Sequence, residues 1–224
     1  MNDNVVNKKS FLSQVTEIVK TNIRNIIIFF SICFVLFLSF QIYSFYISNK
    51  IQKNSISFFA AQNTDDTNVI TDTITKLSND NTFYGVLAKL ELIDLTLKQN
   101  NIEDSISMYL EIINQNNLES VYKSAISSKA SYQLIDINFE NLSSNYLNII
   151  NDFISYIDDE TDSYKGIKLE LKYLIKILEA EKNSIDYSSF NEVNNIYENI
   201  MSSDVVSSAI KERVNKIHEF YSNK

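Results

Sequence analysis

The sequence NIIIFFSICFVLFLSFQIYSFYISN, residues 25–49, contains no charged side chain and is apolar over most of its length. A helix of this length is roughly 37 Å long, which is enough to cross a hydrocarbon core of about 30 Å. Its phenylalanines fall on every side of a helix, whereas an amphipathic helix of a water-soluble domain confines such residues to one face. The stretch therefore predicts a single membrane-spanning helix.

Two other interpretations of this apolar run are a signal peptide and a buried core helix. A secretory signal peptide has an apolar region of about 7 to 15 residues near the N-terminus, and this run is longer and follows a 24-residue tail. A buried helix that is apolar on all sides is usually about 10 to 14 residues long. The length of the run favours a membrane span over both.

The charges that flank the span predict its orientation. Residues 1–24 contain four basic side chains, whereas the residues just after the span contain two, Lys50 and Lys53. Basic residues are retained on the cytoplasmic side of a bilayer. We therefore expect residues 1–24 to be a cytoplasmic tail, residues 25–49 to be the transmembrane helix, and residues 50–224 to form a domain outside the cytoplasm.

The charge of the chain restricts the partners of that domain. The whole chain has 20 basic and 28 acidic side chains, of which four and two lie in residues 1–24, so the remaining 16 and 26 give a net charge of −10. An acidic domain repels phosphate backbones and anionic lipid headgroups. We expect protein partners, and neither nucleic acid nor a small-molecule substrate.

Helices are the expected structure of residues 50–224. The chain has two glycines and no proline, and both residue types are common in the tight turns of a β-sandwich or barrel. Apolar residues recur at helical spacing, so the expected fold is all-α. The predicted pairs of helices are the extended membrane helix with 68–77, 83–98 with 103–115, 119–137 with 141–156, and 164–181 with 188–201, followed by a last helix at 205–221.

A short repeat supports an array of helical hairpins. Tyr109, Leu110, Ile112 and Ile113 recur 37 residues later as Tyr146, Leu147, Ile149 and Ile150, and a weaker copy begins at Tyr197. Periods of about 34 to 40 residues are typical of helix-hairpin arrays. A chance match in a chain rich in Ile and Tyr is the alternative. The spacing predicts a tetratricopeptide-like solenoid. Gln99, Asn100 and Asn101 form the expected turn between two helices, where Asn tolerates the left-handed conformation that usually requires Gly.

The segment NTFYGVLAKLEL, residues 81–92, with the turn at Asn100 and the amphipathic helix at residues 103–113, resembles the tetratricopeptide-like ancillary subunit of the bacterial Sec translocon. The order of tail, span and helical domain is similar as well. The resemblance implies a single-pass protein of the bacterial inner membrane with a periplasmic helical-repeat domain. It also implies the SecYEG channel, periplasmic chaperones and exported polypeptides as partners.

Residues for catalysis or metal binding are scarce in this chain. His218 is the only histidine, which leaves no second histidine for a metal site, and we interpret it as a packing or surface residue. The only cysteine, Cys33, falls inside the span. We interpret Gly85 and Gly166 as positions of close helix packing. We therefore expect neither an enzyme nor a cofactor.

Asp94 and Lys98 are the candidate partner-binding residues. In an array of this kind the first helices of the hairpins line one groove, and both residues face it in the predicted register. We expect a membrane-anchored adaptor or chaperone-like subunit that binds proteins beside the export channel. The alternative is a membrane-tethered helical-repeat scaffold for envelope assembly or cell division.

Overall fold

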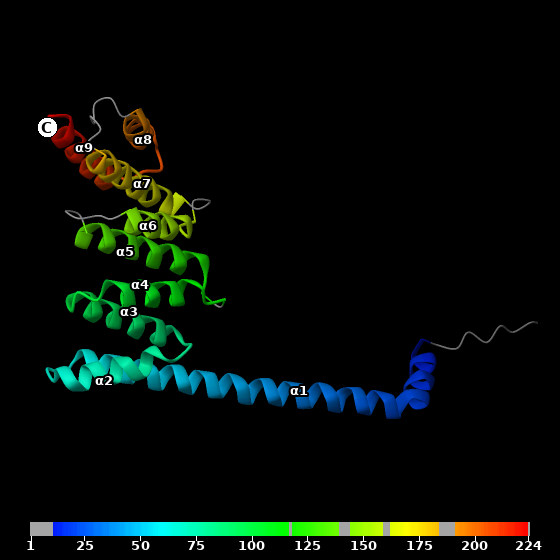
Figure 1. Cartoon of the computed structure of the whole chain (residues 1–224). Helices are drawn as coiled ribbons and strands as arrows, with labels where there is room; N and C mark the ends of the chain where they lie inside the picture. Colours follow the sequence, from blue (N-terminus) through cyan, green and yellow to red (C-terminus); the bar gives the residue numbers. More distant parts are fainter. Residues whose placement is uncertain (1–10, 117, 139–143, 159–161, 184–190, 224) are drawn as a thin grey trace, which may run out of the picture. The chain divides into compact units, whose positions relative to one another are not determined.

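The computed structural model describes residues 11–116, 118–138, 144–158, 162–183 and 191–223 (Figure 1). In these ranges the chain forms nine helices and no strand, which confirms the all-α prediction. The first ten residues of the predicted cytoplasmic tail lie outside them. The described residues divide into two compact units, one within residues 11–73 and 82–84, and one within residues 74–81 and 85–223.

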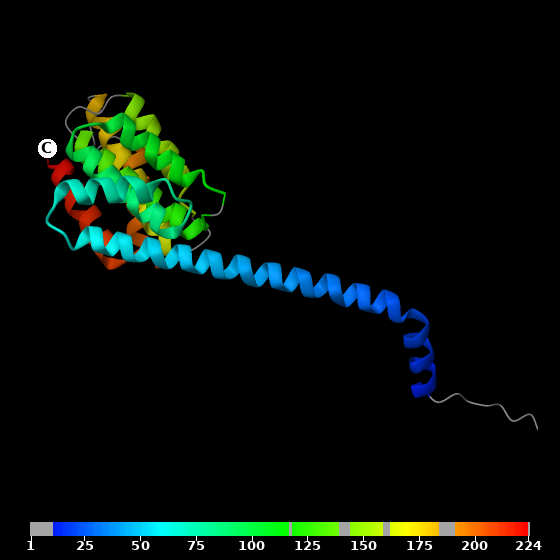
Figure 2. The same cartoon turned by 90° about the horizontal axis from the view of Figure 1, so that it is seen from below.

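The first unit is dominated by helix α1, Phe11–Gln62, which is 52 residues long (Figure 2). Its apolar side chains project outward, with Phe29 63 % and Phe45 70 % exposed. The core-helix interpretation is therefore wrong, because a core helix buries such side chains. Among the described residues α1 is the one helix long and apolar enough to cross a membrane.

The end of α1 extends beyond the predicted span, as the sequence pattern indicated. The Asn54 side-chain amide donates a hydrogen bond to the Thr82 hydroxyl at 3.0 Å. The rings of Phe58 and Phe59 each lie 6.1 Å from the ring of Tyr84. Residues 82–84 therefore pack along the last turns of α1.

Helix α2, Thr67–Ser78, follows α1, and the Asp66 carboxylate accepts a hydrogen bond from the backbone N–H of Asn68 at 3.0 Å near its start. Seven further helices begin and end within a few residues of their predicted bounds. They are α3 (Phe83–Lys98), α4 (Ile102–Ile113), α5 (Ser120–Asn138), α6 (Ser144–Ser155), α7 (Asp162–Lys182), α8 (Asn191–Ser202) and α9 (Ser208–Ser222).

The turn between α3 and α4 lies where the sequence predicted it, and one of its two Asn residues adopts the left-handed conformation. Asn100 has φ 60°, the left-handed conformation, and is the one non-glycine residue with positive φ in the described chain. Asn tolerates this conformation better than most residues because its short polar side chain bonds locally. Asn101 then caps α4 by accepting a hydrogen bond from the backbone N–H of Asp104.

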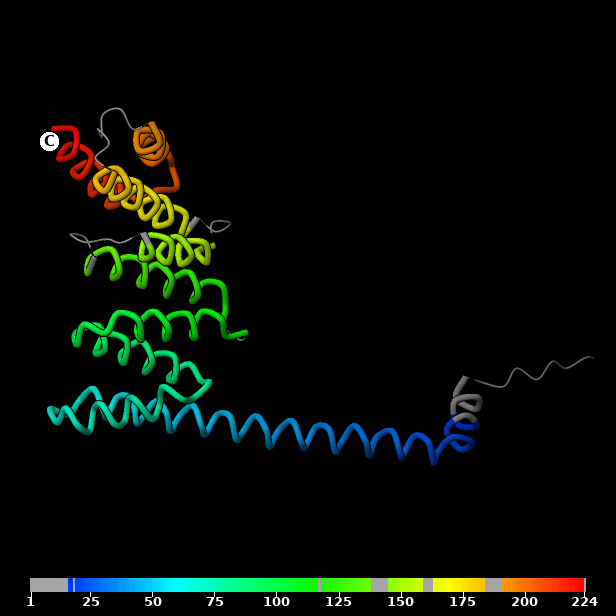
Figure 3. The backbone as a smooth tube through the Cα atoms, in the orientation of Figure 1, coloured from blue at the N-terminus to red at the C-terminus, as the bar shows by residue number. Residues whose placement is uncertain are grey.

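The helices of the second unit pack in chain order. From α4 to α9 each helix contacts the next, and the alternate helices α5, α7 and α9 also contact one another in sequence. Helices α3 to α7 alternate in direction, so that α5 and α7 run the same way (Figures 1 and 3). Alternate helices therefore lie side by side on one side of the unit.

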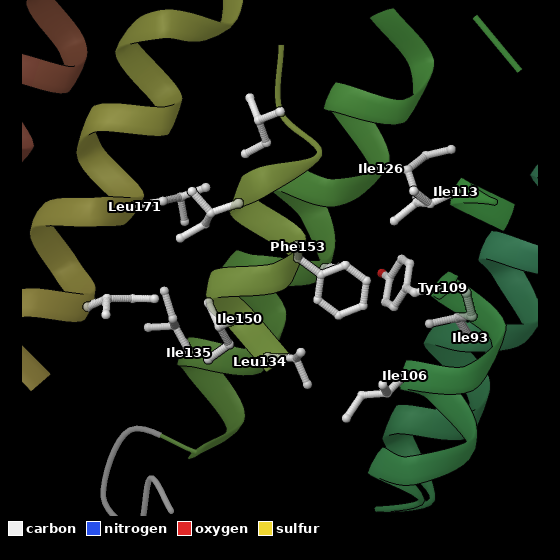
Figure 4. Close-up of a cluster of buried hydrophobic side chains, with 14 of the residues drawn as sticks. Ile93, Ile106, Tyr109, Ile113, Ile126, Leu134, Ile135, Ile150, Phe153 and Leu171 are labelled. Carbon is white, nitrogen blue, oxygen red and sulfur yellow. The ribbon is translucent and has the colours of Figure 1, made fainter. Parts of the chain in front are cut away.

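Two apolar clusters form the core of this unit. The larger joins α3 to α7 and centres on Tyr109 and Phe153, whose rings meet edge to face with centroids 6.0 Å apart (Figure 4). Each fully buried side chain of this size contributes about 1.5 to 3 kcal/mol of apolar transfer free energy. The smaller cluster joins α7, α8 and α9 through Tyr173, Val193 and Val214.

The helical array is longer in period than the sequence repeat suggested. Tyr109, Tyr146 and Tyr197 lie on α4, α6 and α8, the second helices of the predicted hairpins. The buried positions Ile106 and Ile112 of α4 correspond to Leu147 and Phe153 of α6, which follow them by 41 residues (147 minus 106, and 153 minus 112). Tyr109 is fully buried, whereas Tyr146 is partly exposed. The 37-residue copies are therefore not structurally equivalent.

Candidate functional site

The two residues predicted to bind a partner lie at different levels of α3. The Asp94 carboxylate is half-buried, 2.7 Å from the Lys129 ammonium, and accepts a hydrogen bond from the Gln133 side-chain amide at 2.9 Å. Lys98 lies in the last turn of α3 and is exposed. The structure therefore ties Asp94 to α5 and leaves Lys98 at the surface, and their role in partner binding stays a prediction.

A polar network extends from Asp94 into the core. The Tyr109 hydroxyl on α4 donates a hydrogen bond to the Gln133 side-chain oxygen. Burial, together with the negative charge of Asp94, raises the pKa of Tyr109 above its ordinary value, so the hydroxyl stays protonated and acts as a donor. The network holds α3, α4 and α5 in register, because each of its groups loses a partner if one helix slides.

A second network centres on Glu170 of α7, which is 2 % exposed. Its carboxylate accepts two hydrogen bonds from the Arg213 guanidinium of α9, at 2.8 and 2.7 Å, and one from the Tyr132 hydroxyl of α5 at 2.7 Å. Burial and the bond to Glu170 raise the pKa of Tyr132. Such two-pronged, charge-assisted bonds are among the strongest in proteins. They connect α5, α7 and α9.

The sequence contained a signal for this second network that our prediction missed. Glu170 stands four residues after Gly166 and three before Tyr173, so helical periodicity places it on the buried stripe of α7. A carboxylate on such a stripe requires a partner, since an unpaired buried charge is costly. The position of Arg213 as that partner depends on how α9 packs and cannot be read from spacing alone.

An apolar groove lies where α5, α7 and α9 meet, and we call it the α5–α7–α9 groove. Its volume is about 320 Å³, at the lower end of the range for ligand-binding pockets. It is lined by Ile135, Leu174, Ile177, Leu178, Lys216, Ile217, Phe220 and Tyr221. Phe220 is 63 % exposed at its edge, although its side chain is wholly apolar. The groove can therefore accept apolar side chains from a second molecule.

His218 packs next to this groove, as its interpretation as a packing residue predicted. Its imidazole stacks on the Tyr197 ring with centroids 3.7 Å apart and planes within 10°. The Tyr173 hydroxyl is 3.3 Å from its Nδ1. Burial lowers the pKa of His218 below its ordinary value, and the nearby charge of Glu219 opposes this effect.

The lowered pKa of His218 predicts a pH dependence of stability. When the pKa of a histidine is lower in the folded than in the unfolded state, folding favours its neutral form. The contribution of His218 to stability is therefore complete above pH 6.5 and is lost as the pH falls below that value. We expect the urea midpoint of the full-length protein in mild detergent to fall between pH 7 and pH 5. A His218→Phe variant, which keeps the aromatic stack, should lose less over the same range, and equal losses would contradict the prediction.

The described residues contain no group of three or more His, Cys, Asp or Glu side chains placed to hold a metal ion. Cys33, the only cysteine of the chain, is exposed on α1. The α5–α7–α9 groove is the candidate site that we consider further, and its lining offers apolar contacts. Comparison of the chain with protein-family models, with curated proteins and with solved structures finds no match in any of the three.

Proposed function

We propose that this protein is a non-enzymatic, membrane-anchored adaptor or chaperone-like subunit that binds polypeptides through the α5–α7–α9 groove. The observation that carries the proposal is an open apolar groove on a helical array whose chain also contains a helix fit to span a membrane. Anchoring raises the local concentration of the groove near other membrane components, so that weak contacts suffice.

We further propose that the helical array lies on the periplasmic side of the bacterial inner membrane, beside the Sec translocon. Its support is the resemblance of residues 81–92 and the excess of basic residues before the span. A tetratricopeptide-like solenoid is part of the same proposal. Packing of each helix from α4 to α9 on the next supports it. The spacing of 41 residues between corresponding buried positions of α4 and α6 exceeds the usual 34 of that repeat.

The test is site-specific photo-crosslinking in native membranes. Full-length protein should remain in the membrane pellet after alkaline carbonate extraction, because a spanning helix is not released by high pH. A photoreactive residue in place of Phe220 should then capture exported polypeptides or translocon subunits. The matched control is a photoreactive residue in place of Tyr122, which is also an exposed aromatic residue but lies outside the groove.

Three outcomes would count against the proposal. Release of the protein by carbonate would show that it is not anchored by a spanning helix. Equal capture from positions 220 and 122 would show that the groove is not the binding site. Capture of septal proteins alone would favour the scaffold alternative over a role in export.

A further inference from the structure

We infer that the α5–α7–α9 groove selects polypeptide segments in which a short apolar run is flanked by Lys or Arg residues. The inference rests on the proposed function, because it specifies the ligand of the same groove. It follows from the charges around the groove, which specify the flanks of a bound segment, whereas the apolar walls specify its centre.

The walls alone specify an apolar occupant. Ile135 of α5 and Ile177 and Leu178 of α7 are buried and form part of the lining. Lys216 is the one charged residue of the lining, and its ammonium lies 2.7 Å from the Glu212 carboxylate. The positive charge of the lining is thus already balanced, and the groove has no free cation to attract an acidic segment.

Two shallower, more open hollows adjoin the groove, and each adds one carboxylate. One shares Ile135 with the groove and includes Asp136 of α5, which is exposed and has no ion-pair partner among the described residues. The other shares Lys216 and Phe220 and includes Glu219 of α9. The Glu219 carboxylate accepts a hydrogen bond from the Asn215 amide at 2.7 Å, a neutral partner that leaves its charge uncompensated. Negative charge therefore borders the groove on two sides.

The helix ends add to this negative potential. Ile135 and Tyr221 lie in the last turns of α5 and α9, which end at Asn138 and Ser222. The C-terminal ends of α5, α7 and α9 point toward the same side of the unit (Figures 1 and 3). Each C-terminus carries a partial charge of about −0.5. Lys182 in the last turn of α7 offsets this charge there, whereas neither α5 nor α9 has a basic residue in its last turn.

These charges select among the apolar molecules that fit the walls. A fatty acid or an anionic lipid would bring its own negative group next to Asp136 and Glu219, which is unfavourable. A polypeptide with basic residues beside its apolar run pairs with both carboxylates. Packed helices lie about 8 to 10 Å apart, so the distance from α5 across α7 to α9 is roughly 16 to 20 Å. An extended chain covers this distance in about five or six residues.

The test uses full-length protein in nanodiscs of a zwitterionic lipid and three fluorescent peptides. Each peptide has six residues of Leu and Val in its centre, flanked on both sides by two Lys, two Glu or two Ser residues. Fluorescence anisotropy measures binding, with empty nanodiscs as the blank. We expect the Lys peptide to bind roughly tenfold more tightly than the Glu peptide, and this advantage to shrink in 0.5 M salt through screening.

Variants separate the charge from the groove itself. The double variant Asp136→Asn and Glu219→Gln should abolish the preference for Lys over Glu and leave binding of the Ser peptide unchanged. Asp152→Asn, which removes an exposed carboxylate on α6, is the matched control and should keep the preference. Phe220→Ala should lower the binding affinity of all three peptides by roughly tenfold.

The outcomes distinguish the two proposals. Equal affinity for the Lys, Glu and Ser peptides, with loss of binding in Phe220→Ala, would overturn the charge selection and leave the groove as a binding site. Binding of none of the peptides would contradict the proposed function. Preference for Lys that persists in the double variant would also overturn the inference, because the selecting charges would lie elsewhere.

Discussion

Replacement of Arg213 by Ala is expected to lower the free energy of unfolding by about 3 kcal/mol. The guanidinium donates two hydrogen bonds to Glu170, and their removal leaves a carboxylate that is 2 % exposed with only the Tyr132 hydroxyl as a described partner. The cost arises from this uncompensated charge in the core, since Arg213 itself is more than half exposed. Urea unfolding of the full-length protein in detergent, followed by circular dichroism, measures the change.

Two further variants of the same network serve as controls. Lys216→Ala breaks the exposed ion pair with Glu212 on the same helix and should leave the urea midpoint unchanged, because solvent screens that pair. The double variant Glu170→Met and Arg213→Leu should recover most of the stability lost in Arg213→Ala, because it removes both charges. An Arg213→Ala variant as stable as Lys216→Ala would show that the buried pair does not hold α7 to α9.

Replacement of Gly85 by Ala is expected to destabilise the protein by about 3 kcal/mol. A Cβ atom at this position would lie 1.8 Å from the carbonyl oxygen of Asp80 and 3.1 Å from that of Leu77. Both contacts are with backbone, so the turn before α3 has to move rather than a flexible side chain. The cost is therefore at the upper end of the range for overpacking, even though Ala favours a helix by about 1 kcal/mol over Gly.

Gly166→Ala is the matched control for this prediction, because it is the same substitution at the other glycine of the chain. Its Cβ atom would lie 3.2 Å from Cδ1 of Ile210, the end of a side chain that can rotate away. We expect the free energy of unfolding to stay unchanged or to rise by up to about 1 kcal/mol. Thermal and urea unfolding of both variants test the pair, and equal effects at the two sites would contradict the predicted difference.

Local features of the fold were predictable from the sequence. Helix bounds follow from apolar spacing within one segment, and the left-handed turn at Asn100 follows from the residue type at a helix end. Each of these depends on a few neighbouring residues, which is why pattern and residue type were sufficient. The close packing of Gly166 was also predicted, but its partner Ile210 on α9 was not. Gly85 lies against the backbone of Asp80 in the turn before α3 and of Leu77 at the end of α2.

Features that depend on how helices meet were not predictable. The 37-residue repeat did not give the structural correspondence between α4 and α6. By burial, Ile106 and Ile112 of α4 correspond to Leu147 and Phe153 of α6, 41 residues later. A difference of four residues is about one helical turn, so both registers place apolar residues on the same face. The partners of Glu170 and the α5–α7–α9 groove are set by contacts between distant segments, which no single helix encodes.

The groove lies across the boundary between the two apolar clusters of the helical array. Ile135 and Leu178 belong to the larger cluster, whereas Ile177 belongs to the smaller one and Ile217 packs against it. In an array held by neighbour contacts the terminal helices fray at lower energy than the interior. A segment bound across this boundary would contact both clusters, so α9 could not detach from α7 without losing the contacts to that segment. If the proposed polypeptide binds there, occupancy would slow the local opening of the C-terminal end of the array.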